Sequence, residues 1–250
     1  MNSRRKFLIQ GSLATTAVLA LKPFNAIARA ALPFTGLSGS NGKLVFLHTV
    51  NLNPSSDFKT IQYIKDIKNQ NGNAILLKAG QDEQYEASQL IYDVPFNSDH
   101  DLSVITGDYK IIKKGSIRTG IINAGPGDSD VIQKINTLSA YLKKEKNCSV
   151  VVCLSRLGYK NNNSPDDVTL AKKSTDLDII IGGHAQNFHK HPVIALNSNN
   201  GEVIIHSAAG DTSGFGKIEI DFDGWGRKKL ISFTDQSYKN TTPNRALPAA

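Results

Sequence analysis

The chain has 250 residues, and its 29 lysine and arginine side chains against 22 acidic ones give a formal net charge of +7. Residues 1–30 hold five of the basic side chains and no acidic one, which leaves 24 basic against 22 acidic side chains in the remainder. This near balance gives no support to nucleic-acid binding, which usually needs a clustered basic face, and we expect no nucleic-acid partner. The remaining length suits one large domain or two small ones.

Residues 1–30 have the composition of a targeting segment. Arg4 and Arg5 precede an apolar, small-residue run, "GSLATTAVLAL", and "AIARAA" then offers cleavage sites near Ala28 and Ala30. The run is shorter than the roughly 20 apolar residues that a membrane-spanning helix needs. The paired arginines resemble the twin-arginine export signal, which predicts export to the bacterial periplasm and membrane contact only through the signal. An ordinary secretory signal is the alternative.

The next segments alternate between strand and helix patterns. Residues 42–50 read as a buried strand, and 58–70 as a helix with Phe58, Ile61, Ile64 and Ile67 on one face. Residues 73–80 form a second strand pattern, and "YEASQLIY" (85–92) is compatible with a short helix. From Tyr109 the period changes to two, which predicts a hairpin turning at residues 114–116. Residues 128–146 then predict a helix that begins with Asp128 or Ser129 as its N-cap.

The second half predicts strands at 148–155 and 177–183, with a helix that begins near Pro165 between them. Residues 193–208 and 216–233 have arms separated by Asn/Gly turns and are antiparallel in character. Cys148 and Cys153 would lie on opposite faces of one strand about 16 Å apart, so we expect two buried thiols rather than a disulfide. We therefore expect a linker at 31–42, one mixed α/β domain at 43–235 with at least two sheets and outer helices, and a polar tail at 236–250.

The stretch "VVVCLSRLGYKNNNSPDDVTLAKKSTDLDIIIGGHAQ" (150–186) resembles the 5'-nucleotidase family of calcineurin-like metallophosphoesterases. The similarity continues through "NSNNGEVIIHSAAGDTSGFGKIEIDFD", and it includes "KLVFLHTVNLN" and "NGNAILLKAGQ" earlier in the chain. The resemblance implies two packed mixed β-sheets flanked by helices, in four α/β/β/α layers. It covers only the family's N-terminal metallophosphatase domain, and we expect the separate C-terminal substrate-binding domain to be absent.

The family's two-metal hydrolysis needs acidic oxygen ligands, because neutral ligands leave two dications repelling each other. Asn51 and Asn53 stand where the family has D-x-H, and Gln81 stands in place of the bridging Asp. The third motif, G-N-H-[DE], has no convincing match. Arg156 replaces the His of S-H-L-G, and a guanidinium cannot act as a ligand. Only His184 and Gln186 keep the family pattern, G-H-x-[HQ]. The resemblance therefore implies an eroded centre with no catalytic residue and no bound metal.

Several functions stay open at this stage. An inactive domain could bind phosphate or a nucleotide through Arg156, Lys78, Asn51 and Asn53, or Arg156 could be an ordinary solvated loop residue and the site empty. An active phosphoesterase would need a rearranged Zn, Mn or Mg centre around His184, drawing on His189, His191, His206, Asp82, Asp166 or Asp211. An interaction domain that pairs with a separately encoded nucleotidase C-terminal domain is the third possibility.

Overall fold

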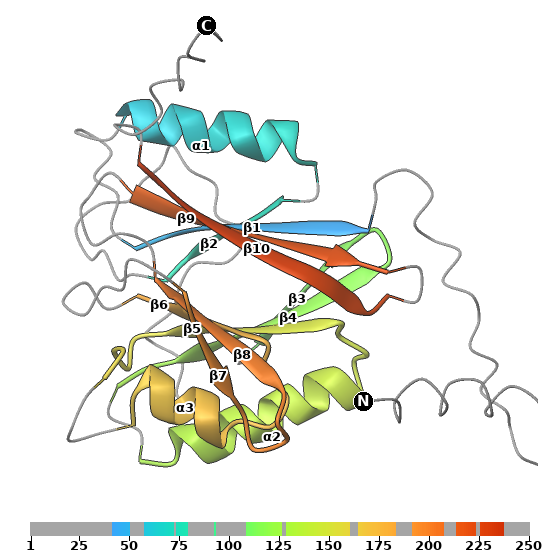
Figure 1. Ribbon diagram of the computed structural model, residues 1–250, viewed down its shortest axis with the longest axis vertical. Coiled ribbons are helices and arrows are strands. Elements are labelled where there is room, and N and C mark those ends of the chain that lie inside the picture. Colours follow the sequence, from blue (N-terminus) through green and yellow to red (C-terminus); the bar gives the residue numbers. More distant parts are fainter. Residues whose placement is uncertain are drawn as a thin grey trace, which may run out of the picture. The chain divides into compact units, whose positions relative to one another are not determined.

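A computed structural model describes residues 42–50, 58–72, 74–79, 93, 109–126, 129–160, 165–183, 192–207, 214–223 and 226–237. The chain divides into two compact units, Met1–Leu32 and Pro33–Ala250, and all the described residues belong to the second. They form ten strands and three helices, which Figure 1 labels in chain order.

The larger sheet has six strands in the order β3-β4-β5-β6-β8-β7. Its strands are β3 (Tyr109–Lys114), β4 (Ile117–Ala124), β5 (Val150–Ser155), β6 (Ile179–Gly182), β8 (Glu202–Ser207) and β7 (Val193–Leu196). The four central strands are parallel, whereas β3 and β7 run antiparallel to their neighbours. The predicted hairpin is confirmed as β3–β4, and Gly115 supplies the positive φ of 60° that its turn requires.

The smaller sheet has four strands in the order β10-β9-β1-β2. These are β10 (Lys228–Ser237), β9 (Gly214–Phe222), β1 (Lys43–Thr49) and β2 (Ala74–Lys78). The β1–β2 pair is parallel, and β9 runs antiparallel to both β1 and β10. The predicted antiparallel arms 193–208 and 216–233 are thus confirmed, although they join different sheets.

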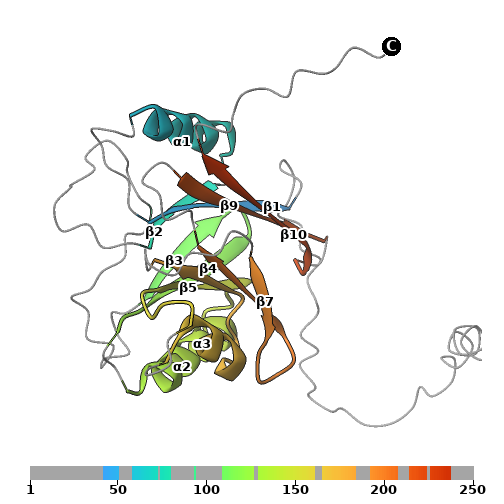
Figure 2. The same cartoon turned by 60° about the vertical axis from the view of Figure 1, so that its left-hand side comes forward.

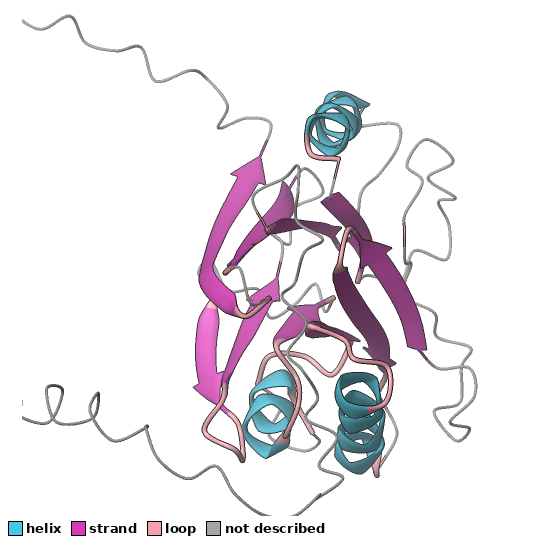
Figure 3. Cartoon of the chain, turned by 90° about the vertical axis from the view of Figure 1, so that its right-hand side faces the viewer, coloured by secondary structure: helices cyan, strands magenta, loops and turns pink. Residues whose placement is uncertain are grey.

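The two sheets pack face to face with helices on both outer faces (Figures 1 and 3). Helix α1 (Phe58–Gln70) covers the four-stranded sheet, and α2 (Val131–Lys144) and α3 (Asp167–Lys173) cover the six-stranded one. A central apolar layer that includes Phe46, Leu154 and Ile218 fills the space between the sheets. The predicted four-layer α/β/β/α class is therefore confirmed.

The helices bury the apolar faces that the sequence predicts, but the N-cap of α2 is not one of the predicted residues. In α2 the residues Val131, Ile135, Leu138 and Leu142 are buried, as their spacing predicts. The N-cap of α2 is Asp130, whose side chain makes no capping hydrogen bond, so the prediction of Asp128 or Ser129 as the cap was wrong. The local pattern contained three polar candidates in a row, and propensity alone does not choose among neighbours.

Both cysteines are buried free thiols, as expected. Burial raises the pKa of the Cys153 thiol well above its usual value, so this side chain is a small apolar residue of the core. The pattern for a short helix at 85–92 and the targeting segment 1–30 lie outside the described residues. None of the helices in the described ranges is long and apolar enough to cross a membrane.

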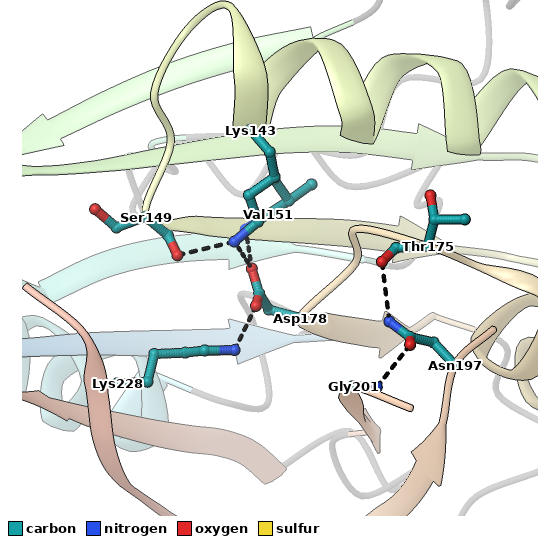
Figure 4. Close-up of polar contacts among 8 residues, drawn as sticks. All are labelled: Lys143, Ser149, Val151, Thr175, Asp178, Asn197, Gly201 and Lys228. Atoms are coloured by element: carbon teal, nitrogen blue, oxygen red, sulfur yellow. Dashed lines mark hydrogen bonds and ion pairs between the residues drawn. The ribbon is translucent and has the colours of Figure 1, made fainter. Parts of the chain in front are cut away.

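A buried carboxylate joins the helix layer and both sheets near the start of β6 (Figure 4). Asp178 accepts hydrogen bonds from the Val151 backbone N–H at 2.6 Å and from Lys143 Nζ of α2 at 2.6 Å. Its other oxygen binds Lys228 Nζ, which comes from β10 of the opposite sheet. The Asp178 side chain is only 7% exposed, so these donors replace the water that the charge has lost.

Candidate functional site

The parallel strands of both sheets end at one edge of the sandwich, and backbone hydrogen bonds tie these ends together. The Ala79 N–H donates to Thr49 O at 3.0 Å, which joins the ends of β2 and β1. In the other sheet the Arg156 N–H donates to Ala124 O at 2.8 Å, and the Gly183 N–H donates to Ser155 O at 2.7 Å. Residues that follow these strands are therefore brought to a common edge.

The two sheets lie in close contact at Gly183. A Cβ built on Gly183 would lie 2.0 Å from the carbonyl oxygen of Ala79, a distance that no side chain tolerates. The second glycine of "IIIGGHAQ" is therefore required by the contact between two main chains, and not by a turn. Through it, the end of β2 lies against the end of β6.

Five of the six predicted degenerate positions lie outside the described residues: Asn51, Asn53, Gln81, His184 and Gln186. In the sequence, however, each stands within four residues of the last residue of β1, β2 or β6. Arg156, the sixth, directly follows β5 and is half-buried. Lys78, the further predicted anion ligand, ends β2 and is also half-buried.

A carboxyl group lies buried directly behind Arg156. Asp167, the first residue of α3, is 2% exposed and accepts a hydrogen bond from the Ser155 hydroxyl. Ser155 Oγ in turn accepts the Leu157 N–H at 3.2 Å, and the Asp167 N–H donates to Gly158 O at 2.8 Å. These contacts hold the turn 156–158 against the start of α3.

Burial raises the pKa of Asp167 to about 7, against the lowering effect of the Ser155 hydrogen bond and with the help of the neighbouring Asp166 charge. The carboxyl group is therefore about half protonated at neutral pH. Sequence reasoning missed this group. The sequence signal for Asp167 is the pair of aspartates in "SPDDVTLA": a helix needs only one N-cap, so the second aspartate is available for another role.

Two histidines occupy the space between the sheets. His48 Nε2 of β1 lies 2.5 Å from His206 Nδ1 of β8, and the rings are nearly perpendicular. Burial, followed by the charge of His206, lowers the pKa of His48 well below its usual value, so its imidazole is neutral. The opposite residue on β9 is Gly216, where a Cβ would lie 2.2 Å from His48 Nε2.

These positions correct the suggested rearranged metal centre for the two candidate ligands that the structure describes. His206 of β8 is 2% exposed and its Nδ1 faces His48 in the core. Asp166 caps α3, where its carboxylate accepts the Thr169 N–H at 2.6 Å. His189, His191, Asp82 and Asp211 lie outside the described residues.

The described part of this edge does not fit a pair of divalent metals. Arg156, which directly follows β5, brings a fixed positive charge to this edge, and a guanidinium offers no lone pair to a metal ion. The nearest described carboxyl, Asp167, is buried and bound to Ser155, and its raised pKa shows that its surroundings disfavour the charged form. Among the described residues no three His, Cys, Asp or Glu side chains are grouped as a metal site would require.

No protein-family model matches the chain, and neither does any curated protein sequence. Solved structures do match. The 5'-nucleotidase precursor of Thermus thermophilus superposes with a TM-score of 0.61 at 17% identity, over 78% of this chain and 54% of that one. The NAD nucleotidase of Haemophilus influenzae gives 0.57 at 13% identity, over 78% and 50%. A calcineurin-like phosphoesterase of Bacillus subtilis gives 0.56 at 14% identity, over 80% and 92%.

The aligned region thus spans about half the length of the two nucleotidases and nearly all of the phosphoesterase. All three share the arrangement of two sheets between helices described above. The chain has the calcineurin-like metallophosphoesterase fold, in the form found in 5'-nucleotidases.

Proposed function

We propose that the chain is an exported metallophosphoesterase-fold protein that has lost two-metal hydrolysis and binds a phosphate-type anion at the strand ends. The observation that carries the proposal is the placement of Arg156. Its backbone N–H, just after β5, is held by the hydrogen bond to Ala124 O at the end of β4. The sequence resemblance aligns this residue with a ligand histidine of the family. A guanidinium at this position repels metal ions and supplies a fixed positive charge instead.

The surroundings of Arg156 favour an oxyanion as the ligand. A half-buried guanidinium loses less hydrogen-bond strength to water than an exposed one and can bind two phosphate oxygens at once. Lys78 ends β2, and the contact between Ala79 and Gly183 brings that strand end against the six-stranded sheet. Asn51 and Asn53 would add neutral amide donors from the segment after β1.

Metallophosphoesterases use divalent metals, but the donor set of this chain supports no hydrolytic step. The proposed function is therefore binding without turnover, in which Arg156 orients the anion and no residue activates water. Zinc, manganese or magnesium would be expected to bind only if acidic and histidine ligands replaced the amide side chains and Arg156 at these positions.

Calorimetric titration of the purified protein with inorganic phosphate and with adenosine monophosphate tests the binding. We expect saturable binding that is lost in Arg156→Ala and kept in Arg118→Ala, a matched change at an exposed arginine of β4. Absence of heat at millimolar ligand would refute the anion site. Stoichiometric divalent metal by elemental analysis, together with phosphatase turnover, would refute the loss of hydrolysis.

The export part of the proposal rests on residues 1–30 alone. Replacing Arg4 and Arg5 together by lysine should retain the protein in the cytoplasm if the twin-arginine route carries it. Immunoblots of periplasmic and cytoplasmic fractions provide the measurement. Unchanged export of the double variant would favour an ordinary secretory signal.

A further inference from the structure

The large apolar side chains that are exposed in the described residues gather at one place. Ile194 and Leu196 of β7 are 55% and 57% exposed, and Leu230 of β10 is 58% exposed. The strands β7 and β10 are the edge strands on the same side of the sandwich, one from each sheet (Figures 1 and 2). Exposed apolar residues are common singly, but a group of them marks an interaction site.

The exposure follows from the unequal size of the two sheets. Val193 and Ala195 of β7 pack under the helices, so the alternate residues Ile194 and Leu196 point toward the side where the four-stranded sheet lies. That sheet ends at β10 in the described part of the chain, and β7 ends the six-stranded sheet. Between them lies a groove of about 430 Å³. Its lining residues are Ile194, Glu202, Ile204, Lys228, Lys229, Leu230, Ile231 and Phe233.

A β-bulge shapes the β10 wall of the groove. The pairing of β10 with β9 shifts between Lys228 and Leu230, so that Lys229 is an extra residue in the strand. Four consecutive residues, 228–231, therefore line the groove, which a regular strand with alternating side chains does not permit. The bulge and the two lysines also hinder open-ended pairing of another strand onto this edge.

The charges of the groove fit a second copy of the same surface. Lys228 is bound to Asp178, whereas Lys229 and Glu202 form no ion pair within the described chain. In a twofold dimer the same patch of both copies is in contact, so a charged patch must contain both signs for the positive group of each copy to face the negative group of the other. Lys229 on one wall and Glu202 on the other meet this condition, with apolar side chains between them.

We propose that the groove between β7 and β10 is a self-association surface, through which two copies of the chain form a twofold dimer. Ile194, Leu196 and Leu230 of each copy pack into the groove of the other, and Lys229 of each faces Glu202 of its partner copy. The apolar area is small, so the dimer forms at micromolar concentrations, in the range of transient complexes.

Sedimentation equilibrium of the full chain from about 1 to about 100 µM tests the proposal, since this range covers weak specific interfaces. The wild type should show a monomer–dimer equilibrium. Leu230→Asp should raise the dissociation constant at least about tenfold, because a desolvated charge replaces a central apolar contact. Circular dichroism and thermal unfolding establish that the variant is folded, as expected for a side chain that is more than half exposed.

Reversing the charges at Lys229 and Glu202 tests whether the groove binds a second copy of the chain. Lys229→Glu and Glu202→Lys should each weaken the dimer, because each places like charges across the axis, and the double variant should regain affinity. Lys113→Glu, on the edge strand β3 at the far side of the same sheet, is the matched control and should leave the dimer unchanged. A wild type that stays monomeric throughout, including one that instead co-purifies with a different protein, would overturn the proposal. So would a dimer that is insensitive to Leu230→Asp, or a double variant that remains as weak as the single ones.

Discussion

Replacing Asp167 by asparagine should make the stability of the protein less dependent on pH. The folded carboxyl has a pKa of about 7 against 3.8 for an ordinary aspartate, because burial disfavours its charged form. The folded state therefore holds its proton about three powers of ten more tightly than the unfolded chain, which corresponds to about 4 kcal/mol. Because the folded pKa is raised, this stabilisation is complete below pH 3.8 and is lost as the pH rises through about 7.

The assay is urea unfolding of the wild type and Asp167→Asn at intervals from about pH 4 to about pH 8. The difference between the two free energies of unfolding cancels groups that both proteins share. It should fall by about 4 kcal/mol from the acidic to the neutral end. Ser155→Ala removes a hydrogen bond that lowers the pKa, so the decline in that variant should extend to higher pH. A difference that stays flat across the range would refute the buried, protonated carboxyl.

Three further results are expected. Gly183→Ala should lower the free energy of unfolding by at least about 2 kcal/mol, seen as a lower melting temperature, because the new Cβ meets the Ala79 carbonyl oxygen at 2.0 Å. Gly72→Ala is the control: a Cβ there meets nothing within 4 Å, so stability should change by less than about 1 kcal/mol. Asp178→Ala should cost about 2–3 kcal/mol in urea unfolding, because it leaves the buried Val151 N–H without its acceptor and removes the ion pairs to two partly exposed lysines, and wild-type stability of this variant would contradict the network. Acidification below pH 6.5 should destabilise the wild type more than His48→Gln, because the lowered pKa of the buried His48 means that only the unfolded chain takes up its proton; equal pH profiles would show that His48 does not stay neutral in the folded protein.

The fold was predictable because the strand and helix periods agree with the packing. Ile61, Ile64 and Ile67 form the buried face of α1, as their spacing indicates. The apolar run at 179–182 is the central parallel strand β6. The sequence pattern predicted that both pairs of arms are antiparallel, but it did not predict which sheet each pair joins. Which edge a strand joins depends on contacts far apart in the chain, such as β9 with β1, and local patterns carry no record of them.

Of the six predicted degenerate site positions the structure describes only Arg156, and sequence patterns did not indicate the groups that surround it. Resemblance to the family indicated Arg156 as a residue at a strand end, and it directly follows β5. Neither the Ser155–Asp167 bond nor the His48–His206 pair was foreseen. Each joins side chains from separate strands or helices, and the pairing of His206 with His48 joins strands of opposite sheets, which no local pattern reveals.

The main-chain contact between Gly183 and Ala79 has a consequence for how such a protein can change. Since atoms common to every residue set the spacing of the sheets there, exchanging the side chains that follow the strands leaves the framework intact. Side chains at this edge can thus change one substitution at a time during evolution without loss of the architecture, and the same independence would let a protein engineer introduce acidic ligands on an unaltered scaffold.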